Sequence, residues 1–210
     1  MLVAFDFDGA LAVSDPFVRL GEQHGTGNDI ASLLDRMRAG DIEHEGGLRS
    51  IADHLEGLET EEVEEAFTHL QRRSGASDLL GALQRAGHHV AVISDAPEVA
   101  IRSCLEADTF DVDTVVGTRL VGEKGALTGE IEGSLLGESK DAVLKEIVAR
   151  EGAEMAETVA VGDDRRDLPM IQAAATGIGV DPDTAVADQC DHVVPTIDRL
   201  QLRFEEHGIV

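Results

Sequence analysis

The sequence predicts an α/β fold with a parallel-sheet core and a small helical cap inserted after the first strand. Short continuous apolar runs, such as residues 2–5 and 158–161, are typical of strands buried on both faces. From residue 76 onward these runs alternate with helical periods of crossover length. Residues 14–75 show helical periods and no good strand pattern. We therefore expect a core of residues 1–13 and 76–210 and a cap of residues 14–75.

The charge composition excludes several classes of partner. The 210-residue chain carries a net charge of −25 and contains three lysines. Such a surface disfavours nucleic acid and anionic membranes, which need basic contacts. Because the acids are spread along the chain, the composition indicates a surface adapted to high salt in a halophilic host. The sequence does not distinguish a monomer from a homodimer.

The cysteine pattern and the N-terminus favour a soluble cytoplasmic protein. Cys104 and Cys190 are isolated and lack metal-site spacing, which suits a reducing compartment. Asp6 and Asp8 interrupt any apolar signal region, and no apolar run approaches membrane length.

The first apolar run ends in two acids that flank one aromatic residue. Asp6 and Asp8 follow residues 2–5, and Gly9 permits a sharp exit of the chain. Open α/β folds bind ligands at the carboxyl edge of the sheet. Two carboxylates so close repel unless a cation lies between them, and such oxygen ligands suit Mg²⁺. The stretch therefore predicts a Mg²⁺ site, with an ordinary acidic turn as the alternative.

Two amphipathic stripes define the cap. The first ends near Gly40, and the second follows Thr60, which we expect to be an N-cap. Their apolar members are Ile30, Leu33, Leu34 and Met37, and then Val63, Ala66, Phe67 and Leu70.

Helices and strands alternate after the cap. We expect Ser77 to cap a helix that Gly87 ends, a strand at 90–93 that ends in Ser94, and a helix from near Pro97 to about Ala107. The remaining expected elements are a β-hairpin at the rim of the sheet over 118–121 and 127–131, a helix at 139–150 capped by Ser139, and strands at 158–161, 177–180 and 192–194. This order predicts a Rossmann-like sheet with right-handed crossovers.

Polar residues lie where these later elements meet the sheet edge. Ser94 precedes a helix N-terminus, whose free N–H groups favour anions. Lys140 lies in the first turn of its helix, where a cation opposes the helix dipole by about 0.3–1 kcal/mol. We therefore interpret Lys140 as a clamp for a phosphate and for the charge of a nucleophile. The alternative is a surface lysine paired with Glu138 or Asp141.

A third acid follows the strand at 158–161. Asp163 would complete the Mg²⁺ site with Asp6 and Asp8, and Asp167 is expected to support the ligands from outside. Each is also compatible with an ordinary aspartate N-cap.

Four stretches, taken in chain order, resemble the motifs of the haloacid-dehalogenase-like hydrolases. They are Asp-Phe-Asp-Gly-Ala-Leu at 6–11, the strand ending in Ser94, Lys140, and Gly-Asp-x-x-x-Asp at 162–167. Within that superfamily the chain is most similar to phosphoserine phosphatases, in the stretches 119–133 and 159–170 and in the position of a helical cap. The resemblance implies an Mg²⁺-dependent phosphomonoesterase that converts phosphoserine to serine and phosphate, a step of serine biosynthesis.

The resemblance also implies individual roles. Asp6 is the implied nucleophile, which forms an aspartyl-phosphate, and Asp8 the implied general acid and base. Lys140 would shield Asp6, and Ser94 would bind a phosphate oxygen. The implied Mg²⁺ ligands are Asp6, Asp163 and the backbone carbonyl of Asp8.

The catalytic motifs depart from the family pattern at five positions. Ala10 stands where the family usually has Thr or Ser, and Asp95 and Ala96 follow Ser94 where it has two Gly residues. Asp164 and Arg166 occupy the usual Gly and Asn positions of the fourth motif.

The cap departs from the pattern as well. Asp15 stands where a Glu binds the amino group of serine, and Ile51 replaces the Arg that binds its carboxylate. Arg49 is a candidate substitute on a different side of the helix. The candidate substrate- and phosphate-binding residues are Ser94, Asp95, Asp15, Arg49 and Arg166.

Two other functions stay open. Ile51, Asp95 and Arg166 favour a phosphatase for another small phosphorylated metabolite. Ala10 and Asp164 favour a catalytically weak, phosphate-responsive binding module. Dehalogenation is disfavoured because the second acid of the first motif serves a phosphatase's leaving group, and a receiver-like domain is disfavoured by the long helical insertion.

Overall fold

A seven-stranded sheet runs through the part of the chain that the computed structural model describes, residues 1–67, 70–105 and 112–210. Its order is β4-β3-β2-β1-β5-β6-β7, and only β4 is antiparallel to its neighbour. The strands are β1 (Leu2–Phe5), β2 (His89–Pro97), β3 (Thr114–Glu123), β4 (Ala126–Glu132), β5 (Thr158–Gly162), β6 (Thr176–Val180) and β7 (His192–Val194). Strands β2, β3 and β4 lie on one side of β1, and strands β5, β6 and β7 lie on its other side. The carboxyl ends of β1, β2 and β5 therefore flank a topological switch point, where ligands bind in open α/β folds.

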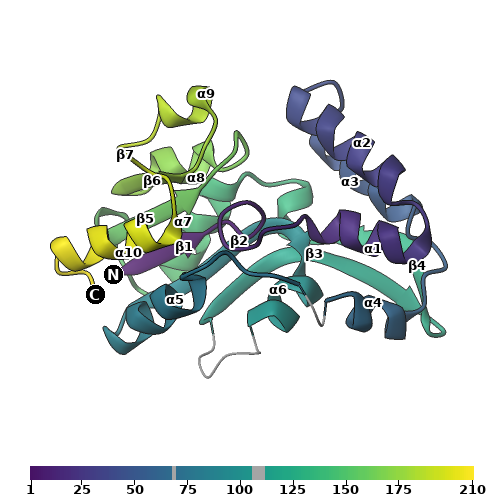
Figure 1. Cartoon of the computed structure of the whole chain (residues 1–210), viewed down its shortest axis with the longest axis horizontal. Coiled ribbons are helices and arrows are strands. Elements are labelled where there is room, and N and C mark those ends of the chain that lie inside the picture. Colours follow the sequence, from purple (N-terminus) through teal and green to yellow (C-terminus); the bar gives the residue numbers. More distant parts are fainter. Residues whose placement is uncertain (68–69, 106–111) are drawn as a thin grey trace.

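Helices cover both faces of the sheet (Figure 1). The apolar side chains of β1 point alternately to the two faces, so both faces must be covered. Val3 and Phe5 pack in the cluster that contains the apolar faces of α5 (Ala76–Arg85), α6 (Glu98–Leu105) and α10 (Ile197–Glu206). Leu2 and Ala4 point to the other face, against α7 (Lys140–Arg150) and α8 (Leu168–Ala173). Shorter connecting helices are η1 (Ser134–Leu136), η2 (Met155–Glu157) and α9 (Thr184–Ala187). The predicted parallel α/β core is confirmed.

A helical insertion follows β1, as predicted. It contains α1 (Pro16–His24), α2 (Gly27–Ala39), α3 (His44–Asp53) and α4 (Thr60–Phe67). The chain between α3 and α4 pairs with β4, because Leu127 N donates to Leu58 O at 2.8 Å and Gly57 N donates to Leu127 O at 2.9 Å. The β3–β4 hairpin thus holds the insertion beside the sheet edge, and α2 and α3 stand as a pair above it (Figure 1).

Several predicted element ends are wrong. Gly75, with φ of 82°, precedes α5 as its N-cap, so Ser77 lies inside the first turn. Thr60 is the first residue of α4 and its hydroxyl donates to Gly125 O, so it does not cap that helix. β2 continues past Ser94 to Pro97 through an irregular register.

The hairpin is also more than an appendage. β3 begins at Thr114, and its first residues pair in parallel with β2 before it turns into the hairpin. The predicted helix end at Ala107 lies outside the described residues. Within the described ranges, no helix combines the length and apolar character needed to cross a membrane.

Candidate active site

The ends of β1, β2 and β5 bring the predicted acids and Ser94 to one edge of the sheet. Asp6 N donates to Val161 O at 2.8 Å, so the pairing of β1 with β5 continues one residue past the strand and fixes Asp6. Ser94 is buried, and its Oγ accepts from Ala96 N at 3.3 Å. Asp163 follows β5 directly.

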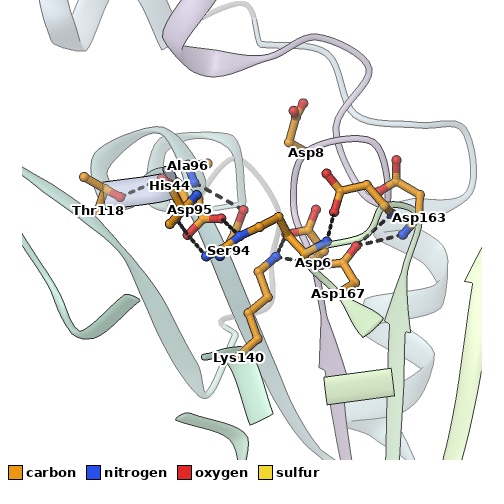
Figure 2. A network of polar contacts seen from close by, with 12 residues as sticks. Asp6, Asp8, His44, Ser94, Asp95, Ala96, Thr118, Lys140, Asp163 and Asp167 are labelled. Carbon is orange, nitrogen blue, oxygen red and sulfur yellow. Dashed lines mark hydrogen bonds and ion pairs between the residues drawn. The ribbon is translucent and has the colours of Figure 1, made fainter. Parts of the chain in front are cut away.

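Lys140 lies between two of these acids. Its Nζ is 2.6 Å from Asp6 Oδ1 and 2.6 Å from Asp167 Oδ1, and the residue is 3% exposed (Figure 2). The surface alternative is wrong, because Asp141 instead accepts from Lys145 Nζ at 2.6 Å. The first turn of α7 therefore delivers a cation to the end of β1.

Three carboxylates gather around this lysine. Single oxygens of Asp6, Asp163 and Asp167 all lie within 4.8 Å of one another. Asp163 Oδ1 is buried without a hydrogen-bond partner, which is costly unless a cation binds it. Oxygen-only donors of this kind fit a hard divalent ion such as Mg²⁺. The carboxylate of Asp8 does not belong to this cluster.

Asp167 is more central than the sequence indicated. Besides binding Lys140, its Oδ2 accepts from Asp163 N at 2.8 Å and Asp164 N at 3.2 Å. It thereby orders the loop that presents Asp163. Gly162 fits beside it because a Cβ there would lie 2.3 Å from Asp167 Oδ2.

Gly9 makes room for the acidic cluster. Its φ is +79°, and a Cβ at this position would lie 2.2 Å from Asp163 Oδ2. Both the backbone conformation and the close approach therefore require glycine.

Burial and mutual repulsion disturb the ionisation of the cluster. Burial, and then Asp167, raise the pKa of Asp6 well above its usual range, although Lys140 opposes them. Burial and Asp167 likewise raise the pKa of Asp163 to about 7. Burial disfavours the charged form of Lys140, but Asp167 and Asp6 outweigh it and raise the lysine pKa above its usual value. The cluster therefore has more negative charge than one ammonium balances, and it favours a further cation.

Asp8 points away from the cluster, into the space below the cap (Figure 2). Burial, and then the nearby Asp15, raise its pKa to about 8. Arg38 of α2 reaches both acids, with Nη2 3.4 Å from Asp8 Oδ2 and 3.2 Å from Asp15 Oδ2. Asp15 also caps α1 by accepting from Phe17 N at 2.9 Å. Asp8 is thus a carboxyl that keeps its proton near neutral pH.

Asp95 is balanced by basic groups from the cap and the core. His44 Nε2 lies 3.1 Å from Asp95 Oδ1, and Arg166 Nε donates to Oδ2 at 3.2 Å. Burial acts to raise the pKa of Asp95, but the His44 hydrogen bond, Lys140 and Arg166 outweigh it and hold it well below the usual range. Thr118 donates to the Asp95 carbonyl at 2.6 Å and fixes this turn (Figure 2).

A cavity between the cap and the sheet edge collects most of the predicted site. It is lined by Asp6, Asp8, Asp15, Ser94, Asp95, Lys140 and Arg166, together with Arg38 and His44. Arg49, also a predicted binding residue, does not line this cavity, and its guanidinium donates to Glu45 at 2.8 Å. Ile51 is fully buried and offers no polar contact. The sequence reasoning missed Arg38 and His44, since neither belongs to a motif.

Comparisons with known proteins agree with this geometry. Residues 3–172 match the family model of the haloacid dehalogenase-like hydrolases. The chain is 37% identical over 208 residues to a phosphoserine phosphatase of Halobacterium salinarum, covering 99% of each chain. A phosphoserine phosphatase of Methanocaldococcus jannaschii is 30% identical, covering 84% of this chain and 83% of its own.

Solved structures resemble the fold as a whole. A substrate-bound phosphoserine phosphatase superimposes with a TM-score of 0.86 at 27% identity, covering 97% of each chain. The same values hold for a phosphoserine phosphatase that carries an analogue of the phospho-aspartyl intermediate.

Proposed function

The chain belongs to the haloacid dehalogenase-like hydrolases, and from this premise we propose that it hydrolyses phosphoserine and related small phosphomonoesters through an aspartyl-phosphate on Asp6. The observation that supports this most directly is the position of Lys140, 2.6 Å from Asp6 Oδ1 and buried. A lysine so placed acts to lower the pKa of Asp6 and so favours the carboxylate form that a nucleophile requires. The full-length similarity to phosphoserine phosphatases supports the choice of substrate.

The proposal assigns Mg²⁺ to the acidic cluster. Asp6, Asp163 and the backbone carbonyl of Asp8 are the proposed ligands, and the orphaned Asp163 Oδ1 supports this assignment. Asp167 is close enough to contribute, although it is already bound to Lys140 and to the loop. When bound, the ion would neutralise charge on the transferring phosphoryl group.

Asp8 is the proposed acid and base. In the first step a carboxylate oxygen of Asp6 bonds to phosphorus, the bond from phosphorus to the ester oxygen breaks, and Asp8 gives that oxygen a proton. In the second step Asp8 takes a proton from water, which attacks the aspartyl-phosphate and releases phosphate from Asp6. A pKa raised to about 8 suits a group that must first be protonated.

Ser94 and the turn after it are the proposed phosphate-binding edge. Ser94 lines the cavity from the core. Residues 14–75 are the proposed cap domain over a core of 1–13 and 76–210. The cap closes the cavity through Arg38 and His44, which supports a role in substrate selection. The substrate is then a small phosphorylated metabolite. The proposed compartment is the cytoplasm, whose reducing conditions suit the thiol form of Cys104 and Cys190.

A second candidate within the family is a phosphatase for another small ester. It is favoured by the buried Ile51 and by Arg166, whose contacts with Asp95 change the polar groups beside the phosphate edge.

The test is phosphate release with Mg²⁺ from phosphoserine and a panel of small phosphomonoesters, for the wild type and Asp6→Asn. We expect release from phosphoserine that Asp6→Asn abolishes. Release that persists in Asp6→Asn would remove the nucleophile assignment. Release from other esters alone would favour the second candidate, and no release from a folded protein would favour a binding module.

A further inference from the structure

We infer that Arg38 is the residue that binds the carboxylate of the substrate and so selects amino-acid phosphomonoesters. The inference rests on the proposed function and assigns a role that no motif of the sequence supplies. It depends on where Arg38 lies, what holds it, and what the other basic groups of the cavity already bind.

The cavity has a phosphate end and an opposite end. Asp6, Ser94 and Lys140 lie at the sheet edge, whereas Asp15 and Arg38 come from the entry to α1 and the end of α2. Apolar side chains of Phe17, Leu34, Met37 and Leu48 line the space around that second end. One anion and one cation, 3.2 Å apart, therefore face the cavity beyond the reacting centre.

This pairing is complementary to a zwitterion. An α-amino acid side carries an ammonium and a carboxylate on one carbon atom, so it needs an acidic and a basic partner close together. Asp15 and Arg38 provide them, and the planar fork of an arginine suits a carboxylate with two parallel hydrogen bonds.

Arg38 is available for such a ligand. Its contacts with Asp8 and Asp15 are long, at 3.4 and 3.2 Å, and a further contact with Asp35 is 3.7 Å. Its side chain is about half exposed, at 51%. A carboxylate of the substrate could replace these partners without leaving a buried charge unpaired.

The other basic groups near the cavity are already committed. Lys140 is buried between Asp6 and Asp167. Arg166 donates twice to Asp95, and His44 binds the same carboxylate. Arg49 binds Glu45 outside the cavity.

Equilibrium binding tests the inference separately from turnover. The Asp6→Asn variant, which the proposed mechanism leaves unable to form the phosphoenzyme, is titrated with phosphoserine and with phosphoethanolamine in the presence of Mg²⁺. The two ligands share the phosphate and the ammonium, and only phosphoserine has the carboxylate. One fixed salt concentration is used, because salt screens half-exposed charges.

We expect Arg38→Ala, added to Asp6→Asn, to weaken phosphoserine binding by about 10- to 100-fold, the range for a hydrogen bond to a charged group. Binding of phosphoethanolamine should change by less than about threefold. Arg38→Lys should restore part of the difference, since it keeps the charge and loses the fork. The matched control is Arg49→Ala, an arginine of the same cap with its partner outside the cavity, which should change neither ligand.

The inference would be overturned if Arg38→Ala weakened the binding of both ligands equally or changed the binding of neither. It would also be overturned if the Asp6→Asn protein did not bind phosphoserine. Melting curves of Arg38→Ala and Arg38→Lys exclude a folding defect as the cause. The proposed function fails independently, through the absence of phosphate release that depends on Asp6.

Discussion

Lys140 Nζ lies 2.6 Å from Asp6 Oδ1 although the two residues are separated by most of the chain. The lysine begins α7 and the aspartate directly follows β1, so the contact exists only when the crossover from the hairpin returns to the middle of the sheet. Both groups are buried, and each charge depends on the other.

Lys140→Met should therefore reduce both activity and stability. We expect phosphate release to fall by about 10²–10³, the usual effect of removing one group that stabilises developing charge. The free energy of unfolding should fall by about 3–5 kcal/mol, because the change leaves buried acids without their cation. Initial rates and chemical denaturation measure the two effects.

Lys145→Ala is the matched control. Lys145 lies on the same helix and pairs with Asp141 at the surface, so its loss should cost no more than about 0.5 kcal/mol and leave the rate unchanged. Similar losses in the two variants would contradict the role assigned to Lys140.

Gly9→Ala should damage the site more than the fold. Gly40 has the same φ of +79° and nothing within 4 Å of an added Cβ, whereas a Cβ on Gly9 meets Asp163 at 2.2 Å. In both variants the left-handed backbone conformation of the new alanine should lower the free energy of unfolding by about 1–2 kcal/mol. Only Gly9→Ala should also displace Asp163, with a loss of activity of about 100-fold and of Mg²⁺-dependent stabilisation.

Melting temperatures with and without Mg²⁺, and initial rates, separate the two glycine variants. If the melting temperature of Gly9→Ala still rises with Mg²⁺ as in the wild type, the added Cβ does not displace Asp163 and the prediction is wrong.

Much of the site was predictable because its residues stand where a periodic pattern stops. Asp6 and Asp163 end short apolar runs, and the carboxyl ends of parallel strands share one edge. Lys140 was recognisable because its helix position is unfavourable for a cation. Once the order of the strands in the sheet is assumed, the acids and the lysine are expected to lie close together.

The cap residues were not predictable in the same way. Arg38 follows Met37 on an amphipathic helix and looks like an ordinary surface residue, and only the orientation of α2 over the sheet aims it at Asp8. His44 begins α3, where its partner is a core aspartate 51 residues later. The start of β3 at Thr114 was missed because Gly117 interrupts its apolar pattern.

The metal-free protein should lose stability as pH rises, and Mg²⁺ should reverse this. The pKa of Asp163 is about 7 in the fold and about 3.9 in an unfolded chain. Between these values the native state holds a proton that the unfolded state has released, so stability falls from about pH 4 to about pH 7. A bound divalent cation compensates the ionised cluster, and its stabilisation should therefore grow over the same window.

Thermal unfolding at about pH 5 and about pH 8, with chelator or with Mg²⁺ at matched ionic strength, measures this coupling. The shift in melting temperature caused by Mg²⁺ should be several degrees larger at the higher pH, and Asp163→Asn should reduce that difference. A shift of equal size at both pH values would count against an ion in the acidic cluster.

Asp8 should make ester cleavage dependent on the leaving group and on pH. Its pKa of about 8, raised by burial and then by Asp15, keeps the acid form at neutral pH. The ratio kcat/KM for phosphoserine, which covers the steps up to release of the alcohol, should therefore fall as pH rises above about 8, because the proton is then lost. Asp8→Asn should lower it by about 10²–10⁴. With p-nitrophenyl phosphate the leaving phenolate needs no proton, so the same variant should lose far less activity and the fall at high pH should weaken. If both esters lose activity equally, Asp8 acts on binding rather than on proton transfer, since a proton donor must discriminate between an alkoxide and a phenolate.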